Sequence, residues 1–206
     1  MHALVHVVDD DDAFRVSLIR MLRAAGYDVR AYASVAEVLL EACLDGPGCF
    51  ILDVNMPGPS GLELQAALAR RNDPPPVIFV SGYLDVPTTV AAMKRGAVDF
   101  LTKPVRAEDL IAAVEGALAI DRAARETRAR DRQCRVRFES LSQRDRDLLK
   151  RVAAGQLNRE IAQQMGIAER TVKLHRARIM DALGAHSLPD LVRIADRLAQ
   201  PTGQAH

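Results

Sequence analysis

Apolar runs alternate with amphipathic stretches along the first 120 residues of the chain. Between two such runs, apolar residues recur at helical spacing from Phe14 through Leu18 to Leu22, and Gly26 ends the pattern. Strands that alternate with helices in this way predict an α/β doubly wound fold, with five parallel strands and helices on both faces of the sheet. The five apolar runs begin at Leu4, Val29, Phe50, Val77 and Val98.

After Leu141 the pattern becomes purely helical. Ser142 is a suitable N-cap for a first helix, and the short turn Gly166–Ala168 separates the second helix from the third. Two helices joined by such a turn favour a helix-turn-helix, so the sequence predicts a small all-α domain of four helices. The four helices are expected at residues 142–154, 158–165, 169–183 and 187–198.

A charged segment separates these two halves. Eleven of the nineteen residues from Asp121 to Glu139 are charged, and none is Gly or Pro. This composition predicts a solvated helical linker that continues the last helix of the first domain. The expected organisation is therefore an α/β domain over residues 1–120, a charged helical linker over 121–140 and a helix-turn-helix domain over 141–206.

The net charge of +1 hides an asymmetry between the halves. Residues 1–120 carry 10 basic and 16 acidic side chains, whereas residues 121–206 carry 18 and 11. The basic half is therefore a candidate for nucleic-acid binding. No apolar run is long enough to span a membrane, and no signal peptide is visible at the N-terminus. Three cysteines without metal-ligand spacing fit a reducing compartment, so we expect a cytoplasmic protein without a membrane partner.

Acidic side chains stand where two of the predicted strands end. Asp9 and Asp10 follow the first strand, Asp53 ends the third, and Lys103 follows the fifth. The carboxyl ends of parallel strands share one edge of the sheet, so these four side chains are expected to converge. Carboxylates about 4 Å apart repel by roughly 4 kcal/mol at an effective dielectric near 20. A bound Mg²⁺, which prefers oxygen ligands, would relieve that repulsion.

The chemistry that suits this cluster is phosphoryl transfer. A carboxylate such as Asp53 can attack phosphorus and hold a phosphoryl group, and the reaction depends mainly on charge neutralisation. Asp9 and Asp10, with the main-chain carbonyl of Asn55, are the expected metal ligands beside Asp53. Lys103 and the Ser81 hydroxyl are expected to contact phosphoryl oxygens. Acids at strand ends also serve as helix N-caps, and that role is favoured for Asp11 or Asp12.

The motifs of the first half resemble the receiver domain of two-component response regulators, which has a flavodoxin-like fold. The resemblance implies that Asp53 accepts a phosphoryl group from a sensor histidine kinase, with Mg²⁺ at Asp9 and Asp10. It also implies that Ser81 and Phe100 act as switch residues, that Lys103 binds phosphate and that the Lys103–Pro104 bond is cis. The matching segments are Val8-Asp9-Asp10, Leu52-Asp53-Val54-Asn55-Met56-Pro57-Gly58-Pro59-Ser60-Gly61, Ser81-Gly82 and Lys103-Pro104.

The third predicted helix of the basic half has two distinct faces. Helical spacing places Val172, Ile179 and Leu183 on its core side. The opposite side would enter a DNA major groove, where Leu174 can contact a thymine methyl group. The alternative is a merely solvated helix face. The expected DNA-contacting residues are Arg170, Thr171, Lys173, Leu174, Arg176, Ala177 and Arg178, of which Arg170, Thr171 and Arg176 are better placed for phosphates.

This half resembles the LuxR-type helix-turn-helix, and the whole chain resembles the NarL/FixJ family, in particular its FixJ-like subgroup. One departure is Ala168, where the family commonly has a Ser that caps the recognition helix, and another is Tyr83 after the switch hydroxyl. The segments that carry the resemblance are Leu141-Ser142-Gln143-Arg144-Asp145, Ala154 to Ala162, Thr171-Val172-Lys173-Leu174-His175, Gly96 to Phe100 and His186 to Arg193.

The resemblance implies a phosphorylation-dependent transcription regulator rather than an enzyme. Phosphorylation is expected to create a dimer face around Phe100, so that two recognition helices bind promoter DNA, and RNA polymerase is a candidate partner. The remaining residues of that face are Val86, Val90, Met93 and Lys94. Two alternatives stay open: a magnesium-dependent aspartyl-phosphate phosphatase, and a receiver that acts only through protein contacts.

Overall fold

The computed structural model describes residues 3–41, 46–82 and 86–199 of the chain. These residues divide into two compact units, residues 1–126 and 127–206. The strands are β1 (Leu4–Val8), β2 (Asp28–Tyr32), β3 (Gly48–Asp53), β4 (Val77–Ser81) and β5 (Asp99–Thr102). The helices are α1 (Asp12–Ala24), α2 (Val35–Glu41), α3 (Gly61–Leu68), α4 (Val86–Lys94), α5 (Ala107–Ser140), α6 (Gln143–Ala153), α7 (Asn158–Met165), α8 (Glu169–Leu183) and α9 (Leu188–Ala199).

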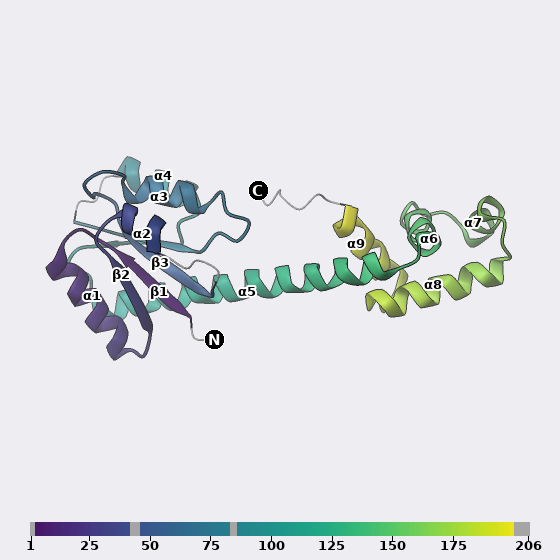
Figure 1. The fold of residues 1–206 in the computed structure, drawn as a ribbon, viewed down its shortest axis with the longest axis horizontal. Coiled ribbons are helices and arrows are strands. Elements are labelled where there is room, and N and C mark those ends of the chain that lie inside the picture. Colours follow the sequence, from purple (N-terminus) through teal and green to yellow (C-terminus); the bar gives the residue numbers. More distant parts are fainter. Residues whose placement is uncertain (1–2, 42–45, 83–85, 200–206) are drawn as a thin grey trace. The chain divides into compact units, whose positions relative to one another are not determined.

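The first unit is a parallel five-stranded sheet in the order β2-β1-β3-β4-β5. All its neighbouring strands pair in parallel, as the alternating pattern predicts. Helices α2, α3 and α4 cover one face, where Tyr32, Phe50 and Phe79 are buried, and α1 and α5 cover the other (Figure 1). The doubly wound α/β prediction is confirmed. The strand order reverses direction at β1 and β3, and ligands of such sheets bind where these two strands end.

The N-terminus of α1 distinguishes two acids that the sequence left equivalent. Asp11 is the N-cap, and its Oδ1 accepts hydrogen bonds from the main-chain N–H groups of Ala13 and Phe14 at 2.9 and 3.1 Å. Asp12 is the first helical residue and pairs with Arg15 instead. The capping prediction is therefore confirmed for Asp11 and wrong for Asp12.

Helix α5 runs without interruption from Ala107 to Ser140 and contributes residues to both units. Its charged segment is not solvated throughout, because Asp121 is 3% exposed. The Asp121 carboxylate accepts hydrogen bonds from the N–H of Gly48 and from Arg125 Nε. Farther along, Cys134 and Phe138 pack against the core of the second unit. The expectation of a solvated linker is therefore wrong at both ends of this segment, because Asp121 is buried within the first unit and Cys134 and Phe138 pack within the second.

The second unit is helical, and its helices begin and end within two residues of the predicted bounds. Ser142 caps α6, as predicted, by accepting the N–H of Asp145 at 3.1 Å. The core combines residues from α6, α7, α8 and α9, including Leu149, Ile161 and Leu191. Among the described residues, no helix has both the length and the apolar character that crossing a membrane requires.

Candidate functional site

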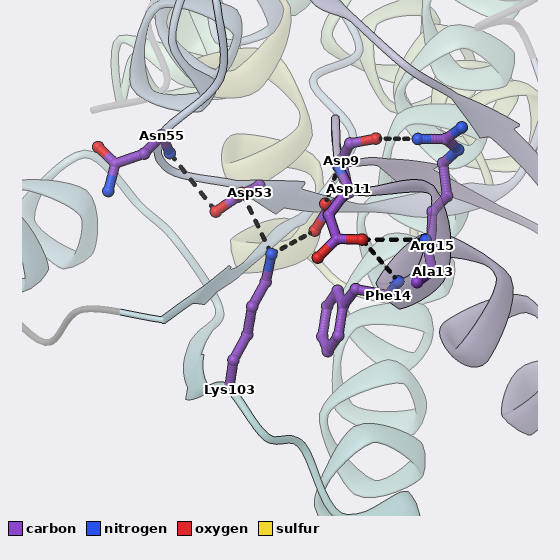
Figure 2. A network of polar contacts seen from close by, with 8 residues as sticks. All are labelled: Asp9, Asp11, Ala13, Phe14, Arg15, Asp53, Asn55 and Lys103. Atoms are coloured by element: carbon purple, nitrogen blue, oxygen red, sulfur yellow. Dashed lines mark hydrogen bonds and ion pairs between the residues drawn. The ribbon is translucent and has the colours of Figure 1, made fainter.

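Three charged side chains meet at the carboxyl edge of the sheet. Asp9 follows β1, Asp53 ends β3 and Lys103 follows β5, and Figure 2 shows them pointing toward one another. Lys103 Nζ donates hydrogen bonds to Asp9 Oδ2 at 2.7 Å and to Asp53 Oδ2 at 3.2 Å. Both carboxylates are buried, with Asp9 1% and Asp53 7% exposed. The structure thus brings together residues that lie 94 and 50 positions from Lys103.

Asp10 completes an acidic cluster with Asp9 and Asp53. One carboxylate oxygen of each residue lies within 4.8 Å of the others. These three oxygen donors fit a hard divalent cation such as Mg²⁺, and Asp10 is exposed, which leaves the cluster open to solvent. The N–H of Asn55 donates to Asp53 Oδ1 at 3.4 Å, so the main chain of Asn55 lies beside the cluster.

The electrostatics of the cluster are unbalanced. Burial raises the pKa of Asp53, Lys103 partly opposes this effect, and the neighbouring charge of Asp9 adds to it. Burial by itself would lower the pKa of Lys103, but hydrogen bonds and attraction from Asp9 and Asp53 outweigh it and raise that pKa. Lys103 therefore stays charged, and this one ammonium group contacts two of the three carboxylates of the cluster. The excess negative charge suits a bound cation, which together with Lys103 would offset the negative charge of an incoming phosphoryl group.

Ser81 and Phe100 lie on the strands next to the cluster. Ser81 ends β4, is 1% exposed, and accepts the N–H of Lys103 on its main-chain oxygen at 2.8 Å. Phe100 is half-buried on β5, with its ring centroid 6.1 Å from that of Phe79. The Lys103–Pro104 peptide bond is cis, which confirms the expectation from the resemblance. Tyr83, the departure noted after Ser81, falls outside the described residues.

Three further residues lie beside the cluster, and the sequence pointed to only one of them, Gly61 in the loop after Asp53. The Phe14 ring lies 4.2 Å from Lys103 Nζ, and Arg15 donates to the main-chain oxygen of Asp9 at 2.5 Å. A Cβ at Gly61 would lie 2.1 Å from the Asp53 main-chain oxygen, so only glycine lets α3 begin this close to the site. The Pro-Gly-Pro-Ser-Gly loop was a sequence signal for Gly61, whereas nothing in the pattern distinguished Phe14 or Arg15 from ordinary helix residues.

Helix α4 carries the apolar residues of the expected dimer face. Val86, Val90 and Met93 are 69%, 44% and 45% exposed, and Lys94 is exposed beside them. The buried Gln65 of α3 holds the other side of α4, since its Nε2 donates to Ala92 O at 3.2 Å and to Arg95 O at 3.4 Å. A helix face with this much exposed apolar area is available for a partner.

The second unit contains the expected helix-turn-helix. Gly166 ends α7 in the left-handed conformation with φ of 64°, and Ala168 is the N-cap of α8 without a side-chain hydrogen bond. Val172, Ile179 and Leu183 are buried, as the helical spacing predicts. Five of the seven expected DNA-contacting residues are exposed on α8, namely Arg170, Lys173, Leu174, Ala177 and Arg178.

The other candidates on α8 have partners inside the unit. Arg176 is half-buried and donates to Asn158 Oδ1 at 2.7 Å, and Thr171 is half-buried. His175 Nδ1 lies 2.6 Å from Asp145 Oδ1 on α6. The pKa of Asp145 lies below its ordinary value. Burial by itself would raise this pKa, but the hydrogen bonds from Ser142 and His175 outweigh that effect and lower it. These contacts hold α8 against α6 and α7, with its outer face exposed.

Two known families match this chain. The family described as "Response regulator receiver domain" matches residues 5–115, and the one described as "Bacterial regulatory proteins, luxR family" matches residues 139–195. The first match contains the acidic cluster and Lys103, and the second contains α6 to α8 and most of α9.

Relatives of known name cover nearly the whole chain. Nodulation protein W of Bradyrhizobium diazoefficiens is 43% identical over 95% of this chain and 86% of its own length. Transcriptional regulatory protein FixJ of Azorhizobium caulinodans is 44% identical over 93% of this chain and 90% of its own length. Among solved structures, response regulator StyR superposes with a TM-score of 0.80 at 38% identity, covering 96% of this chain and 100% of StyR.

Proposed function

Because this chain belongs to the response regulators that join a receiver domain to a LuxR-type DNA-binding domain, we propose that Asp53 accepts a phosphoryl group from a sensor histidine kinase. The modification then promotes dimerisation and the binding of promoter DNA. The observation that carries the proposal is the cluster of three carboxylates, Asp9, Asp10 and Asp53, in which Lys103 contacts both Asp9 and Asp53. The protein is proposed to act in the cytoplasm as a regulator and not as an enzyme.

The chemistry assigns a separate task to each side chain. An Asp53 carboxylate oxygen forms a bond to phosphorus while the bond from phosphorus to the kinase histidine breaks, and the leaving nitrogen keeps the electron pair. Lys103 neutralises a phosphoryl oxygen, and the Ser81 hydroxyl is proposed to donate to another. Asp9, Asp10, Asp53 and the Asn55 carbonyl would hold Mg²⁺. When bound, the ion neutralises charge on the transferred group.

The response is proposed to pass through β4, β5 and α4. Movement of Ser81 and Phe100 toward the phosphoryl group would rearrange the face formed by Val86, Val90 and Met93. Two copies joined by this face would place their recognition helices on half-sites about one helical turn, ~34 Å, apart. On α8, Lys173, Leu174, Ala177 and Arg178 are proposed to reach base edges, with Arg170, Thr171 and Arg176 at the phosphates. RNA polymerase remains a candidate partner.

The phosphoacceptor is tested by incubating the protein with acetyl phosphate and Mg²⁺ and recording the intact mass. We expect the gain of one phosphoryl group, located at Asp53 by peptide mapping and absent in Asp53→Ala. Asp12→Asn is the matched control, because Asp12 lies two residues after Asp10 in the chain and its side chain pairs with Arg15. An unchanged mass, or label at another residue, would contradict the proposal. Sustained turnover of a phosphomonoester would support the phosphatase alternative instead.

Dimerisation is tested by sedimentation with beryllofluoride as the phosphoryl mimic. We expect a dimer in the wild type and a monomer for Val90→Asp, because a charge in the α4 face opposes its burial. Leu39→Asp is a control on α2, where Leu39 is 68% exposed. A wild type that stays monomeric at every concentration, or equal effects of both variants, would count against the proposed face.

DNA binding is tested by mapping bound sites across a genome for the wild type and Asp53→Ala. The affinity of the purified protein for a DNA fragment that carries one of these sites should fall as the salt concentration rises. The reason is that Lys and Arg contacts to phosphates release counterions. Lys173→Ala should weaken binding at all salt concentrations, whereas Lys150→Ala on α6 serves as the control. Binding that is absent or insensitive to salt would favour the alternative of a receiver that acts only through protein contacts.

A further inference from the structure

The ammonium group of Lys103 has a third neighbour besides its two carboxylates. Two of its three N–H donors are accounted for by Asp9 Oδ2 and Asp53 Oδ2. The centroid of the Phe14 ring lies 4.2 Å from Nζ, a distance at which the ring face attracts a cation. Figure 2 shows the ring beside the end of the Lys103 side chain. With these neighbours, the Lys103 side chain is only 19% exposed.

The main chain holds Phe14 in this place. Its N–H donates to Asp11 Oδ1 at 3.1 Å, and the N–H of Asp11 donates to Asp9 Oδ1 at 2.9 Å. Asp9 in turn accepts from Lys103, so the contacts form a closed ring through Asp9, Asp11, Phe14 and Lys103 (Figure 2). The ring of Phe14 is also partly buried against the core formed by α1 and α5. The position of its aromatic face is therefore set by both the N-cap of α1 and the core.

We propose that Phe14 is a positioning residue for phosphoryl transfer, because its ring holds the Lys103 ammonium in place when the contact with Asp53 is given up. This inference rests on the proposed phosphorylation of Asp53. As the Asp53 oxygen bonds to phosphorus, its negative charge moves onto the phosphoryl group and its hold on Lys103 weakens. The contacts of Lys103 with Phe14 and Asp9 do not depend on Asp53. Lys103 therefore remains aimed at the incoming oxygens.

The role is tested by replacing Phe14 with Leu, which keeps an apolar side chain and removes the aromatic face. We expect Phe14→Leu to lower the rate constant of phosphorylation by acetyl phosphate and Mg²⁺ by roughly 2- to 5-fold, the factor that corresponds to a partly exposed cation–π contact. Phe14→Tyr should keep the wild-type rate, since it retains the ring. Val16→Leu is the control on the same helix, where Val16 is 43% exposed. Thermal unfolding of each variant checks that the fold is intact.

A purely structural effect of the substitution is separated by a double-variant comparison. If Phe14 acts through Lys103, Phe14→Leu should slow the wild type but leave the residual rate of Lys103→Met unchanged. An equal slowing in both backgrounds would overturn the positioning role. So would a rate for Phe14→Leu equal to that of the wild type.

A second readout does not require phosphorylation. The chain has only four lysines, Lys94, Lys103, Lys150 and Lys173, so selective isotope labelling resolves each side chain by NMR. The protons near Lys103 Nζ should be shifted by the ring current of Phe14, and that shift should vanish in Phe14→Leu alone. Absence of the shift in the wild type would overturn the contact.

The phosphorylation assay separates the failure of this inference from the failure of the proposed function. A wild type that gains no phosphoryl group overturns the proposed function. A wild type that is phosphorylated, with a Phe14→Leu variant that is phosphorylated at the same rate, overturns only this inference.

Discussion

Strand β3 has a buried carboxylate at each end, and the two surroundings differ in their balance of charge. At its end, Asp53 clusters with Asp9 and Asp10, and the ammonium group of Lys103 contacts Asp53 and Asp9. At its start, Asp121 of α5 accepts the N–H of Gly48 at 3.1 Å and binds Arg125 Nε through both oxygens, at 3.0 and 2.9 Å. Arg125 also lies 3.4 Å from Asp73. Both oxygens of Asp121 thus have a hydrogen-bond donor, whereas the cluster at Asp53 holds three carboxylates and one ammonium group, an excess of negative charge.

The difference separates a structural cluster from a functional one. A paired buried carboxylate contributes to the fold, and removing its charge leaves the cation beside it without a counter-ion and with one acceptor oxygen fewer. An unbalanced cluster destabilises the fold and is relieved by a bound cation or by loss of a charge. The same Asp→Asn substitution should therefore change stability in opposite directions at the two ends of β3.

The largest effect is expected for Asp121→Asn. The amide cannot give Arg125 two charged acceptors, so we expect the free energy of unfolding of the first unit to fall by about 3 kcal/mol. Denaturant unfolding followed by circular dichroism measures the change. Glu108→Gln is the control, since Glu108 pairs with Arg106 at the surface with a side chain 82% exposed, and it should cost less than about 1 kcal/mol. Equal effects of the two variants would contradict a structural role for Asp121.

The next effect concerns His6, which pairs with Phe50 in the middle of β3 and stacks on its ring at 4.5 Å. Burial, with a smaller contribution from Arg30, lowers the pKa of His6 from 6.5 to about 4. Between these values the unfolded chain binds up to one more proton than the folded one, so stability should fall by about 2.5 kcal/mol as the pH drops from 6.5 to 4. His6→Gln, which does not titrate, should lose this part of the pH dependence when denaturation is compared at both pH values.

The third prediction is the counterpart of the first, at the other end of β3. The raised pKa of Asp53 means that its charged form is disfavoured in the folded state, so stability should rise as the pH falls through that pKa. Asp53→Asn should accordingly raise the free energy of unfolding at neutral pH by on the order of 1 kcal/mol, since Lys103 keeps its closer contact with Asp9. A loss of stability as large as that of Asp121→Asn would show that the two clusters are equivalent.

The smallest expected effect is that of the cation itself. Mg²⁺ at three times its dissociation constant should stabilise the wild type by about 0.8 kcal/mol, because only the folded state presents the three carboxylates together. The melting temperature should rise with Mg²⁺ and return when a chelator is added. Asp121→Asn should keep this response and Asp53→Asn should lose much of it. A response that survives in Asp53→Asn would place the cation elsewhere.

Some features followed from local sequence because their causes are local. Apolar runs of strand length, Gly26 and Ser142 determine where elements begin and end, and the spacing of Val172, Ile179 and Leu183 selected the buried face of α8. The acids at the strand ends could be grouped because parallel strands present their carboxyl ends at one edge. For these reasons the strand starts could be predicted to within two residues, and the helix-turn-helix could be predicted as well.

The sequence by itself therefore determined the fold class, the family resemblance and the set of residues at the carboxyl edge of the sheet. Only the tertiary structure decided how those residues pair: that Asp11 caps α1 while Asp12 does not, that Phe14 covers Lys103, and that Asp121 is buried against Gly48. The reason is that strand and helix periodicity reports which face a side chain occupies. Which charge it meets there depends on residues that are dozens of positions away in the chain.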